Sequence, residues 1–511
     1  MDYDARREFL RNLKGVLGSF RRSLVRSGRP TSDRARGQRI VQNFFLHVHP
    51  ARIHEHSLKW STTLGLGIAT TALFVILTVT GVLLMVYYKP SVASAYDSIK
   101  DIHYVVPTGR VMRNAHRWAA QGMVVTVILH LARVFYTAAY KPPREFNWLL
   151  GLALFVLTLG LSFTGYLLPW DQLAFWAVTI GSSVAGSPRE LTDVLGLTQH
   201  FDAGGLLREG LLGAHFIGEE ALIRFYTLHV MVLPIALTTV LGVHFWRIRK
   251  DGGLARPACA EPPPVAPPPA GSDDDPEPAF RLMAVVPERS PATDDDVEGT
   301  VPAWPHVLHV EAAVTMLVLL AVVAVSLVLD APLKGLADPD LPENPAKAPW
   351  YFLGLQELVS YSGFMGGVVI PGLVVLGLAS IPYLDREREE AGVWFSGPRG
   401  ARVAGASAIF GALTCAGVLA VTVRFGWLRT WFPSVPQLVV MLVNPGTVYV
   451  LLCAGWSFWL LRRTNSTRMA AIGLFTCFLV DFIILTWFAT VHRGPNWEFY
   501  WHQSDWPVID H

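Results

Sequence analysis

Long apolar stretches follow one another along this chain, each flanked by short polar segments. About 20 mostly apolar residues suffice for a helix to cross the ~30 Å hydrocarbon core of a bilayer. None of the stretches alternates apolar and polar residues as the strands of membrane barrels do. The pattern therefore predicts an all-α, polytopic transmembrane helical bundle. Eight spans are clear and a ninth, 437–461, is broken by Asn444-Pro445-Gly446; the full set is 62–87, 117–137, 148–168, 222–246, 306–329, 366–384, 403–423, 437–461 and 469–490.

Composition supports a membrane protein, because only 16% of the 511 residues are charged and soluble domains carry about 25%. The net charge of +2 is small and no nucleic-acid-binding signature is present. Residues 1–59 hold 13 Lys or Arg and no apolar core of the signal-peptide kind. The positive-inside rule then puts this segment in the cytoplasm, as for a multi-pass protein of a bacterial inner (cytoplasmic) membrane. Nine spans would leave the C-terminus outside and eight would leave it inside.

Four histidines lie in two of the apolar spans, His116 with His130 and His229 with His244. The separations of 14 and 15 residues put each pair on roughly one helix face, about 21–23 Å apart along the axis. An ionisable group in hydrocarbon is costly and usually faces a functional interior. Neutral imidazole is an axial ligand of haem iron. Two such helices side by side would form two bis-histidine haem sites at different depths of the membrane.

Glycines repeat with the same spacing in two other spans, as Gly67 with Gly81 and Gly151 with Gly165. Backbone without side chains, at two levels of one helix face, would make room for the edge of a porphyrin. The alternative is that these glycines have no functional role, because glycine is common in membrane helices. Arg117 directly follows His116 and Arg133 comes three residues after His130; both are candidates to pair with haem propionates, or to extend toward the membrane surface.

The four cysteines form no CxxC or CxxCH pattern, which argues against a c-type haem or a cysteine-bound iron–sulfur cluster in this chain. Residues 251–300 are rich in Pro, Ala and Asp and are predicted to be a disordered cytoplasmic linker. Residues 1–45 are predicted to form a basic amphipathic helix on the cytoplasmic leaflet.

The residues around the histidines resemble cytochrome b of the quinol–cytochrome c reductases, the Rieske/cytochrome bc complexes. The resemblance covers 60–250 closely and 300–385 less closely, and it is weak beyond 390. The 15-residue gap from His229 to His244 is similar to the photosynthetic and Gram-positive branch, in which the haem-bearing and C-terminal parts are often separate subunits. Here both are fused in one chain. The matching motifs are His116-Arg117-Trp118, Gly165-Tyr166-Leu167-Leu168-Pro169-Trp170-Asp171-Gln172, Arg224-Phe225-Tyr226-Thr227-Leu228-His229, Arg249-Lys250 and Pro349-Trp350-Tyr351-Phe352.

The resemblance implies two non-covalent b-type haems, an outer one held by His116 with His229 and an inner one held by His130 with His244. It also implies an outer quinol-oxidation pocket between the loop after Trp170 and the loop carrying Trp350 and Tyr351. An inner quinone-reduction pocket would lie near Arg249, Lys250 and Asp251. The implied metal ligands are His116, His229, His130 and His244.

The activity implied is that of a quinol:cytochrome c (or similar acceptor) oxidoreductase coupled to proton translocation. One electron would go to a Rieske iron–sulfur protein and the other through the two haems. The implied partners are that Rieske protein, a c-type cytochrome or similar acceptor, quinone and membrane lipid, in a homodimer within a multisubunit complex.

Two departures from the family pattern matter. The outer-pocket motif usually reads Pro-Glu-Trp-Tyr, whereas Lys347-Ala348-Pro349-Trp350-Tyr351 has proline at the glutamate position. Glu357 is the first candidate for the missing proton acceptor and Asp171 the second; a structural carboxylate is the alternative for Glu357. The first span also has Gly65 where a cysteine would attach a third haem, so a covalent third haem is not expected.

The sequence divides into five predicted parts. These are a basic N-terminal segment (1–59), a di-haem four-helix domain (60–250), the linker (251–300), a C-terminal cytochrome b domain (301–390), and additional helices with an aromatic tail (391–511). The last part has no chemistry assigned by the resemblance. Two other functions compete with a cytochrome b: a di-haem membrane anchor of another quinone-linked dehydrogenase, and a cofactor-free transporter using the histidines as a proton relay.

Overall fold

The computed structural model describes residues 30, 32–43, 46–251, 253–255, 299–385, 387 and 391–507. Most of the predicted linker and of the predicted amphipathic helix lies outside the described residues. The chain forms two compact units, one of residues 1–58 with 262–310 and a larger one of 59–261 with 311–511. All four predicted ligand histidines belong to the larger unit.

The smaller unit contains a short antiparallel strand pair. β1 (Arg52–His54) pairs with β2 (Thr300–Pro302) in the register Arg52 to Pro302. The guanidinium of Arg52 donates to Thr300 Oγ1 at 3.0 Å and to Asp33 Oδ2 at 2.8 Å. Ser32 caps the helix that follows it by accepting from Ala35 N at 3.2 Å. The other elements of this unit are α2 (Asp33–Gln42), η1 (Leu46–Val48) and α3 (Glu55–Leu58), and α15 begins in it.

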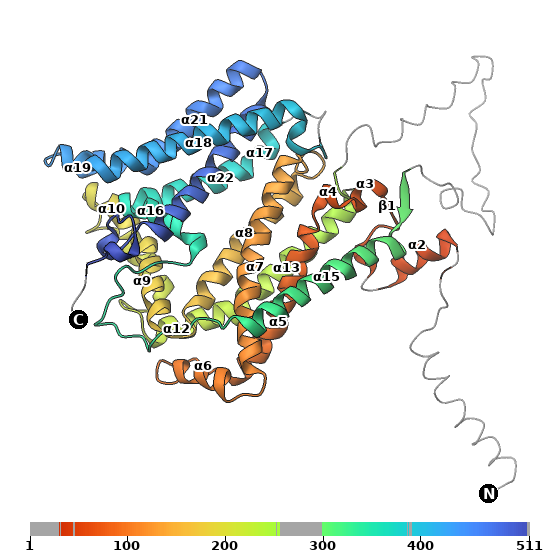
Figure 1. Cartoon of the computed structure of the whole chain (residues 1–511), viewed down its shortest axis with the longest axis horizontal. Helices are drawn as coiled ribbons and strands as arrows, with labels where there is room; N and C mark the ends of the chain where they lie inside the picture. The colour runs from red at the N-terminus through yellow and green to blue at the C-terminus, as the bar shows by residue number, and fades with distance from the viewer. Residues whose placement is uncertain are drawn as a thin grey trace, which may run out of the picture. The chain divides into compact units, whose positions relative to one another are not determined.

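Eight helices of the described chain are long and apolar enough to cross a membrane, which confirms the all-α, multi-pass fold. Their order along the chain, from orange through green to blue, can be followed in Figure 1. Two of them pass through a π-helical turn (η) and one ends in a short extra helix. They are α5 (Leu66–Tyr87), α7 (Gly109–Tyr136), α8 (Glu145–Tyr166), α12–η2–α13 (Glu219–Thr227, Leu228–Val232 and Leu233–Lys250), α15 (Ala303–Val328), η4–α17 (Met365–Val369 and Ile370–Leu384), α18–α19 (Pro398–Phe425 and Leu428–Trp431) and α22 (Thr467–Val491).

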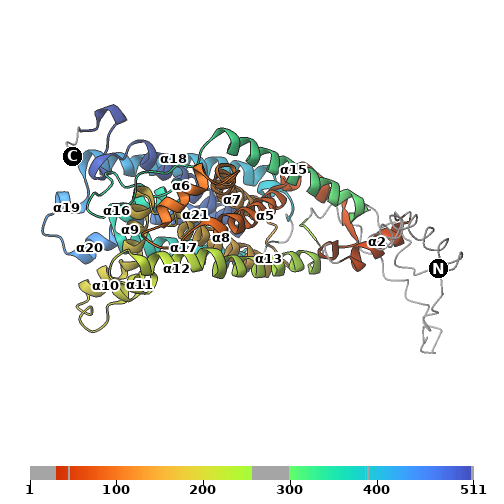
Figure 2. The same cartoon turned by 90° about the horizontal axis from the view of Figure 1, so that it is seen from below.

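The first four of these spans pack together as α5 on α7, α7 on α8, and α8 on α13. Figure 2 shows α12 and α13 as one long rod beside α8. The end of α15 is fixed to α7 because Asn114 donates to Ser326 O at 2.9 Å and to Asp330 Oδ1 at 3.0 Å. These contacts set the four histidine-bearing and glycine-bearing helices side by side.

Short helices cover the ends of the spans. Two begin at a capping aspartate: Asp171 accepts from Ala174 N, and Asp202 accepts from Gly205 N. They are α4 (Trp60–Thr63), α6 (Ala95–Tyr104), α9 (Gln172–Gly186), α10 (Pro188–Val194), α11 (Ala203–Leu212), α16 (Trp350–Tyr361), η5 (Trp394–Ser396), α20 (Gln437–Leu442), η6 (Pro495–Trp497) and η7 (Gln503–Asp505).

The doubtful ninth span is broken where the sequence predicted a break. α20 ends at Leu442, and Asn444 caps a new helix, α21 (Pro445–Thr464), by accepting from Thr447 N at 3.1 Å. α21 packs against both α18 and α22, and the three lie side by side in Figure 1. Only two residues, 465 and 466, separate α21 from α22, so the chain reverses there. α21 is not one of the eight described helices that are long and apolar enough to cross a membrane, so the ninth pass stays a prediction.

A buried polar cluster joins the end of α7 to the start of α22. Asp385 accepts from Tyr140 OH at 2.5 Å and lies 3.3 Å from Lys141 Nζ. Arg468, fully buried, donates to Tyr140 OH at 2.9 Å and to Phe135 O at 2.9 Å. Burial lowers the pKa of Lys141. The C-terminal helices are therefore fastened to the four-helix part by charged hydrogen bonds as well as by apolar packing.

Candidate functional site

His116 on α7 faces His229 in η2 across the bundle. Their ring centres are 6.1 Å apart and the rings are nearly perpendicular, at 78°. Two metal–nitrogen bonds of ~2 Å each, added to the short distance from each nitrogen to its ring centre, give a separation of about 6 Å. The spacing of the two rings is therefore the spacing that one metal ion between them requires.

Hydrogen bonds fix which ring nitrogen of this pair points inward. His116 Nδ1 lies 2.9 Å from Thr80 Oγ1, and that hydroxyl already donates to Ile76 O at 2.7 Å. His229 Nδ1 lies 3.1 Å from Leu161 O, which can only accept. Both rings therefore carry their proton on Nδ1 and leave the lone pair of Nε2 for a metal.

Each of the four predicted glycines faces the Cε1 atom of one of the four histidines. A Cβ added at Gly81 would lie 3.2 Å from Cε1 of His116, and one at Gly165 would lie 2.4 Å from Cε1 of His229. These two contacts form one level of the bundle. A second level, 14 residues along each glycine helix, has Gly67 at 3.3 Å from Cε1 of His130 and Gly151 at 3.8 Å from Cε1 of His244.

The glycines thus make room for the imidazole rings, whereas the sequence suggested only room for a porphyrin edge. Nothing in the sequence paired a particular glycine with a particular histidine. The contacts pair each glycine with one histidine. We call the level that contains His116 and His229 the upper level, and the level that contains His130 and His244 the lower level. At the lower level, Nδ1 of His130 is buried and has no hydrogen-bond partner among the described residues.

A π-helical turn reconciles the unequal spacings of the two histidine pairs. η2 contains His229, and the amide of Leu233 donates to Leu228 O, five residues earlier. Pro234 follows and has no N–H to offer. A π turn holds one residue more than an α turn. The 15 residues from His229 to His244 therefore cover the same number of helical turns as the 14 residues from His116 to His130 on α7. Both histidines of each helix consequently face the same partner helix.

The two predicted propionate-pairing arginines have protein partners. The guanidinium of Arg117 lies 5.0 Å from the ring centre of Tyr166, at the end of α8. Arg133 is buried, and its Nε donates to Thr62 O at 2.8 Å. Arg117 therefore stays next to the upper histidine level, while Arg133 holds α7 to the segment before α5.

Trp350 and Tyr351 begin α16 and contact the four-helix part directly. Trp350 Nε1 donates to Gln121 Oε1 on α7 at 2.7 Å. Tyr351 is buried; burial raises its pKa above the ordinary value, and its hydroxyl interacts with Ser162 and lies near Arg117. Ser162 is three residues before Gly165 on α8. The phenol of Tyr351 is thus a protonated group close to the upper histidine level.

Asp171, the second candidate proton acceptor, holds two loops together. Its Oδ1 caps α9 by accepting from Ala174 N at 2.8 Å, and its Oδ2 accepts from Lys334 N at 2.9 Å. The backbone of Gln172 also donates to Gly335 O at 2.9 Å. These bonds fasten the loop after Trp170 to the loop that precedes α16.

Glu357 on α16 is completely buried and bound by three side chains. Its Oε1 accepts from Tyr361 OH at 2.7 Å, and its Oε2 accepts from Arg493 Nε at 3.0 Å and from Trp497 Nε1 at 3.0 Å. Burial, reinforced by the Glu357 charge, raises the pKa of Tyr361 well above its ordinary value. The sequence contained no signal for Arg493 or Trp497 as partners, because they lie more than 130 residues away.

Arg249 and Lys250 are in the last turn of α13, beyond the lower histidine level. Lys250 Nζ lies 4.9 Å from the ring centre of Trp246. Arg247 Nη2 forms an ion pair with Asp251 Oδ1 at 2.8 Å. Basic side chains therefore gather at this end of the helix.

Sequence reasoning missed Thr80, the hydrogen-bond partner of His116. A signal was available: threonine immediately precedes glycine both at Thr80-Gly81 and at Thr164-Gly165, and Thr164 Oγ1 lies 3.4 Å from His229 Nδ1. Both dipeptides occur at the upper level. An acceptor at Nδ1 raises the basicity of the opposite ring nitrogen and tunes a metal bound there.

If His116 binds a haem iron as the sequence predicts, replacing Thr80 by valine should raise the midpoint potential of that haem. The loss of the acceptor makes His116 a poorer donor to an oxidised metal, by about 20–60 mV if the bond contributes roughly 0.5–1.5 kcal/mol. Redox titration of the purified protein measures this shift. Thr78→Val is the matched control, because Thr78 Oγ1 donates to Phe74 O within its own helix. Equal potentials in the two variants would contradict the assignment.

Comparison with known proteins places this arrangement among electron-carrying membrane proteins. The sequence profile of the family Cytochrome b/b6/petB matches residues 54–252. The cytochrome b6 of Heliobacterium mobile is 41% identical over 204 residues, which are 40% of this chain and 88% of that protein. The cytochrome b6 of Synechococcus elongatus is 41% identical over 187 residues, 37% of this chain and 81% of the relative.

A solved structure titled "Hyperthermophilic respiratory Complex III" has a similar fold over a longer range. It covers 84% of this chain and 91% of its own with a TM-score of 0.54, at 21% sequence identity. The likeness in fold therefore continues past the region matched by the family profile.

Helices, histidines and relatives together define a multi-pass membrane protein of the electron-transfer class. The chain belongs to the cytochrome b/b6 family, which implies b-type haem and oxidoreductase chemistry. The residues present fit that group. His116 and His229 are spaced so that they could hold one iron between them, and glycine lies beside every candidate ligand.

Proposed function

We propose that this chain is the membrane-embedded subunit of a quinol:cytochrome c (or similar acceptor) oxidoreductase, with two b-type haems held by four histidines. The observation that supports it most is the pair of matched levels, each made of two histidines and two glycines. His116 and His229 would hold the outer haem, and His130 and His244 the inner one. When bound, the haems would supply one-electron carriers between an outer quinol site and an inner quinone site.

The outer site would lie where α16 meets α7 and α8. Trp350, fixed by Gln121, would form its wall, and Tyr351 would offer a hydroxyl that burial keeps protonated. The loop held by Asp171 would close the site from the other side. Quinol oxidation there releases two protons and two electrons, and we propose that one electron goes to a Rieske protein. Arg249 and Lys250 would form the inner site.

The basic residues support the proposed orientation in a bacterial inner membrane. Lys141, at the end of α7, contacts Asp385, just after α17, and Arg468, at the start of α22, contacts the same carboxylate. These helix ends therefore lie together, and the positive-inside rule assigns such an end to the cytoplasm. Proton release at the opposite end would couple electron transfer to translocation. The di-haem part (60–250), the quinol-oxidation part (301–390) and the additional helices (391–511) are proposed as functional divisions.

Haem content and redox titration test the proposed function. The purified, membrane-extracted complex should contain two b-type haems per chain, both reducible by quinol. His229→Leu should leave one haem, whereas His215→Leu, a change at an exposed surface residue, should leave two. Folded protein without haem would overturn the proposal and favour a transporter. Two haems with no quinol-driven reduction would favour the anchor of another dehydrogenase.

A further inference from the structure

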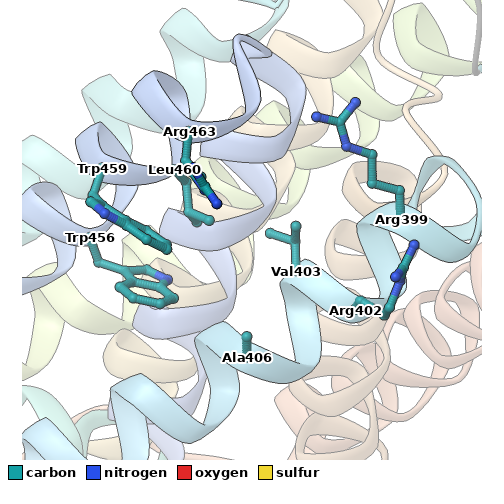
Figure 3. A pocket seen from close by; sticks show the side chains of 8 residues that line it. All are labelled: Arg399, Arg402, Val403, Ala406, Trp456, Trp459, Leu460 and Arg463. Atoms are coloured by element: carbon teal, nitrogen blue, oxygen red, sulfur yellow. The ribbon is translucent and has the colours of Figure 1, made fainter.

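A groove opens between the first turns of α18 and the last turns of α21, in the part of the chain beyond the family profile. Its volume is about 430 Å³. Figure 3 shows Arg399 and Arg402 on α18 on one side of it, and Arg463 on α21 on the other. Arginine is the residue best suited to phosphate, because its planar fork donates two parallel hydrogen bonds.

No carboxylate balances the positive charge of the groove among the residues that the structure describes. None of the residues that line the groove there is Asp or Glu. Arg399, Arg402 and Arg463 are all exposed, and Arg399 Nη2 donates to a backbone oxygen, that of Thr464, at 3.0 Å. Among the residues that the structure describes, none of the three forms an ion pair with a carboxylate. An anion is therefore the ligand that the charges favour.

Aromatic rings form the adjoining wall of the groove. Phe410, Trp456 and Trp459 make a continuous stack, with ring centres 4.4 Å and 4.9 Å apart. Trp456 Nε1 donates to Ser407 Oγ at 2.9 Å, which holds the stack against α18. Trp459 is half exposed, at 51%. A flat apolar wall next to three guanidinium groups suits a ligand with an anionic head and an apolar body, and Trp is the residue that favours membrane–water interfaces.

The groove lies at the end of the bundle where the basic residues gather. α18 begins there and α21 ends there, three residues before Thr467, whose hydroxyl donates to Glu387 Oε1 at 3.0 Å. Anionic phospholipids give the cytoplasmic leaflet a negative surface potential, and basic pockets between membrane helices on that side bind their head groups. A soluble anion would use the arginines alone and leave the tryptophan wall unexplained.

We propose that this groove is a binding site for one anionic phospholipid, with its phosphate between Arg402 and Arg463 and its glycerol and acyl part against Trp459. The site is independent of the proposed quinol chemistry, because it uses none of the residues of the haem or quinone sites. It gives the additional helices a role in fixing membrane lipid beside the electron-transfer subunit.

Titration of the full, detergent-solubilised complex with phosphatidylglycerol, followed by native mass spectrometry, tests the site. The double variant R402Q/R463Q should lower the affinity for phosphatidylglycerol on the order of tenfold or more. Each basic group near an anionic lipid raises the affinity about fivefold. The variant R402K/R463K keeps the charges but loses the paired donors, so its binding should lie between that of the native protein and that of R402Q/R463Q. Phosphatidylcholine should bind weakly to all forms.

Arg462→Gln is the matched control, because it removes the same charge one residue away. Arg462 lies 5.1 Å from the ring centre of Phe458 and does not line the groove, so lipid binding should be unchanged. An equal loss in R462Q would reduce the effect to general surface charge and overturn the proposal. Inorganic phosphate that competes as well as the lipid would assign a free-anion site instead. Unchanged binding in R402Q/R463Q, with helix content and thermal stability intact, would also overturn it.

Discussion

Replacing Gly165 by alanine should remove one of the two proposed haems from the purified protein. The added Cβ would lie 2.4 Å from Cε1 and 2.9 Å from Nδ1 of His229, closer than nonbonded atoms approach. Both groups sit on packed helices, so relief requires His229 to turn away from His116 or α8 to shift. Overpacking of this kind costs roughly 1–3 kcal/mol, and a ligand ring that has moved no longer meets its partner at the native separation of 6.1 Å.

Gly151→Ala is the matched control on the same helix. Its Cβ would lie 3.8 Å from Cε1 of His244, an ordinary contact, so both haems should remain. Haem per chain by the pyridine haemochrome assay should fall from about two to about one in Gly165→Ala alone. The same haem content in both variants would show that the upper level tolerates a methyl group and that the contact at Gly165 does not fix the ring.

Replacing Glu357 by glutamine should strongly destabilise the protein. The carboxylate is fully buried and is the acceptor for Tyr361, Arg493 and Trp497. A neutral amide leaves Arg493 as a buried charge without its counter-ion, and breaking a buried pair in this way costs about 3–5 kcal/mol. Burial acts to lower the pKa of Arg493, and its hydrogen bonds and ion pair with Glu357 raise it, so the variant removes the interactions that stabilise the charged guanidinium in this buried place.

A double variant separates this structural role from the predicted proton role. Glu357→Gln with Arg493→Met removes both charges and should recover much of the thermal stability lost by either single change. Turnover per haem decides the second question. If it falls several-fold in Glu357→Gln and stays low in the double variant with both haems bound, Glu357 accepts a proton from quinol. If it returns with stability, the prediction from the sequence fails and Glu357 serves to hold the C-terminal tail on α16.

Local periodicity explains why some features were predictable from the sequence. The apolar spans were, because helix length and hydropathy are properties of consecutive residues, and the described chain contains eight candidate spans. The break at Asn444-Pro445-Gly446 was also visible as a cap and a proline at the first helical position. The 14-residue repeats of histidine and glycine likewise required only the geometry of one helix.

Contacts between distant segments could not be predicted in this way. The two arginines are equivalent candidates in the sequence, but packing leaves Arg117 beside Tyr166 and buries Arg133 against Thr62. The sequence left Glu357 as either a proton acceptor or a structural carboxylate, and only the structure shows that residues from the far end of the chain surround it. Thr80 was not singled out, because its importance depends on the ring of His116, which reaches it from a neighbouring helix.

The sequence by itself determined a helical membrane protein with histidines on two helix faces and glycines on two others, because the 3.6-residue period of a helix depends only on residues close together in the chain. Only the tertiary structure decided which glycine receives which imidazole, how a π turn at His229 brings unequal spacings into phase, and where Glu357 finds its counter-charge. These depend on how helices pack against one another. That packing is the sum of many weak contacts between residues far apart in the chain, and no local pattern specifies it.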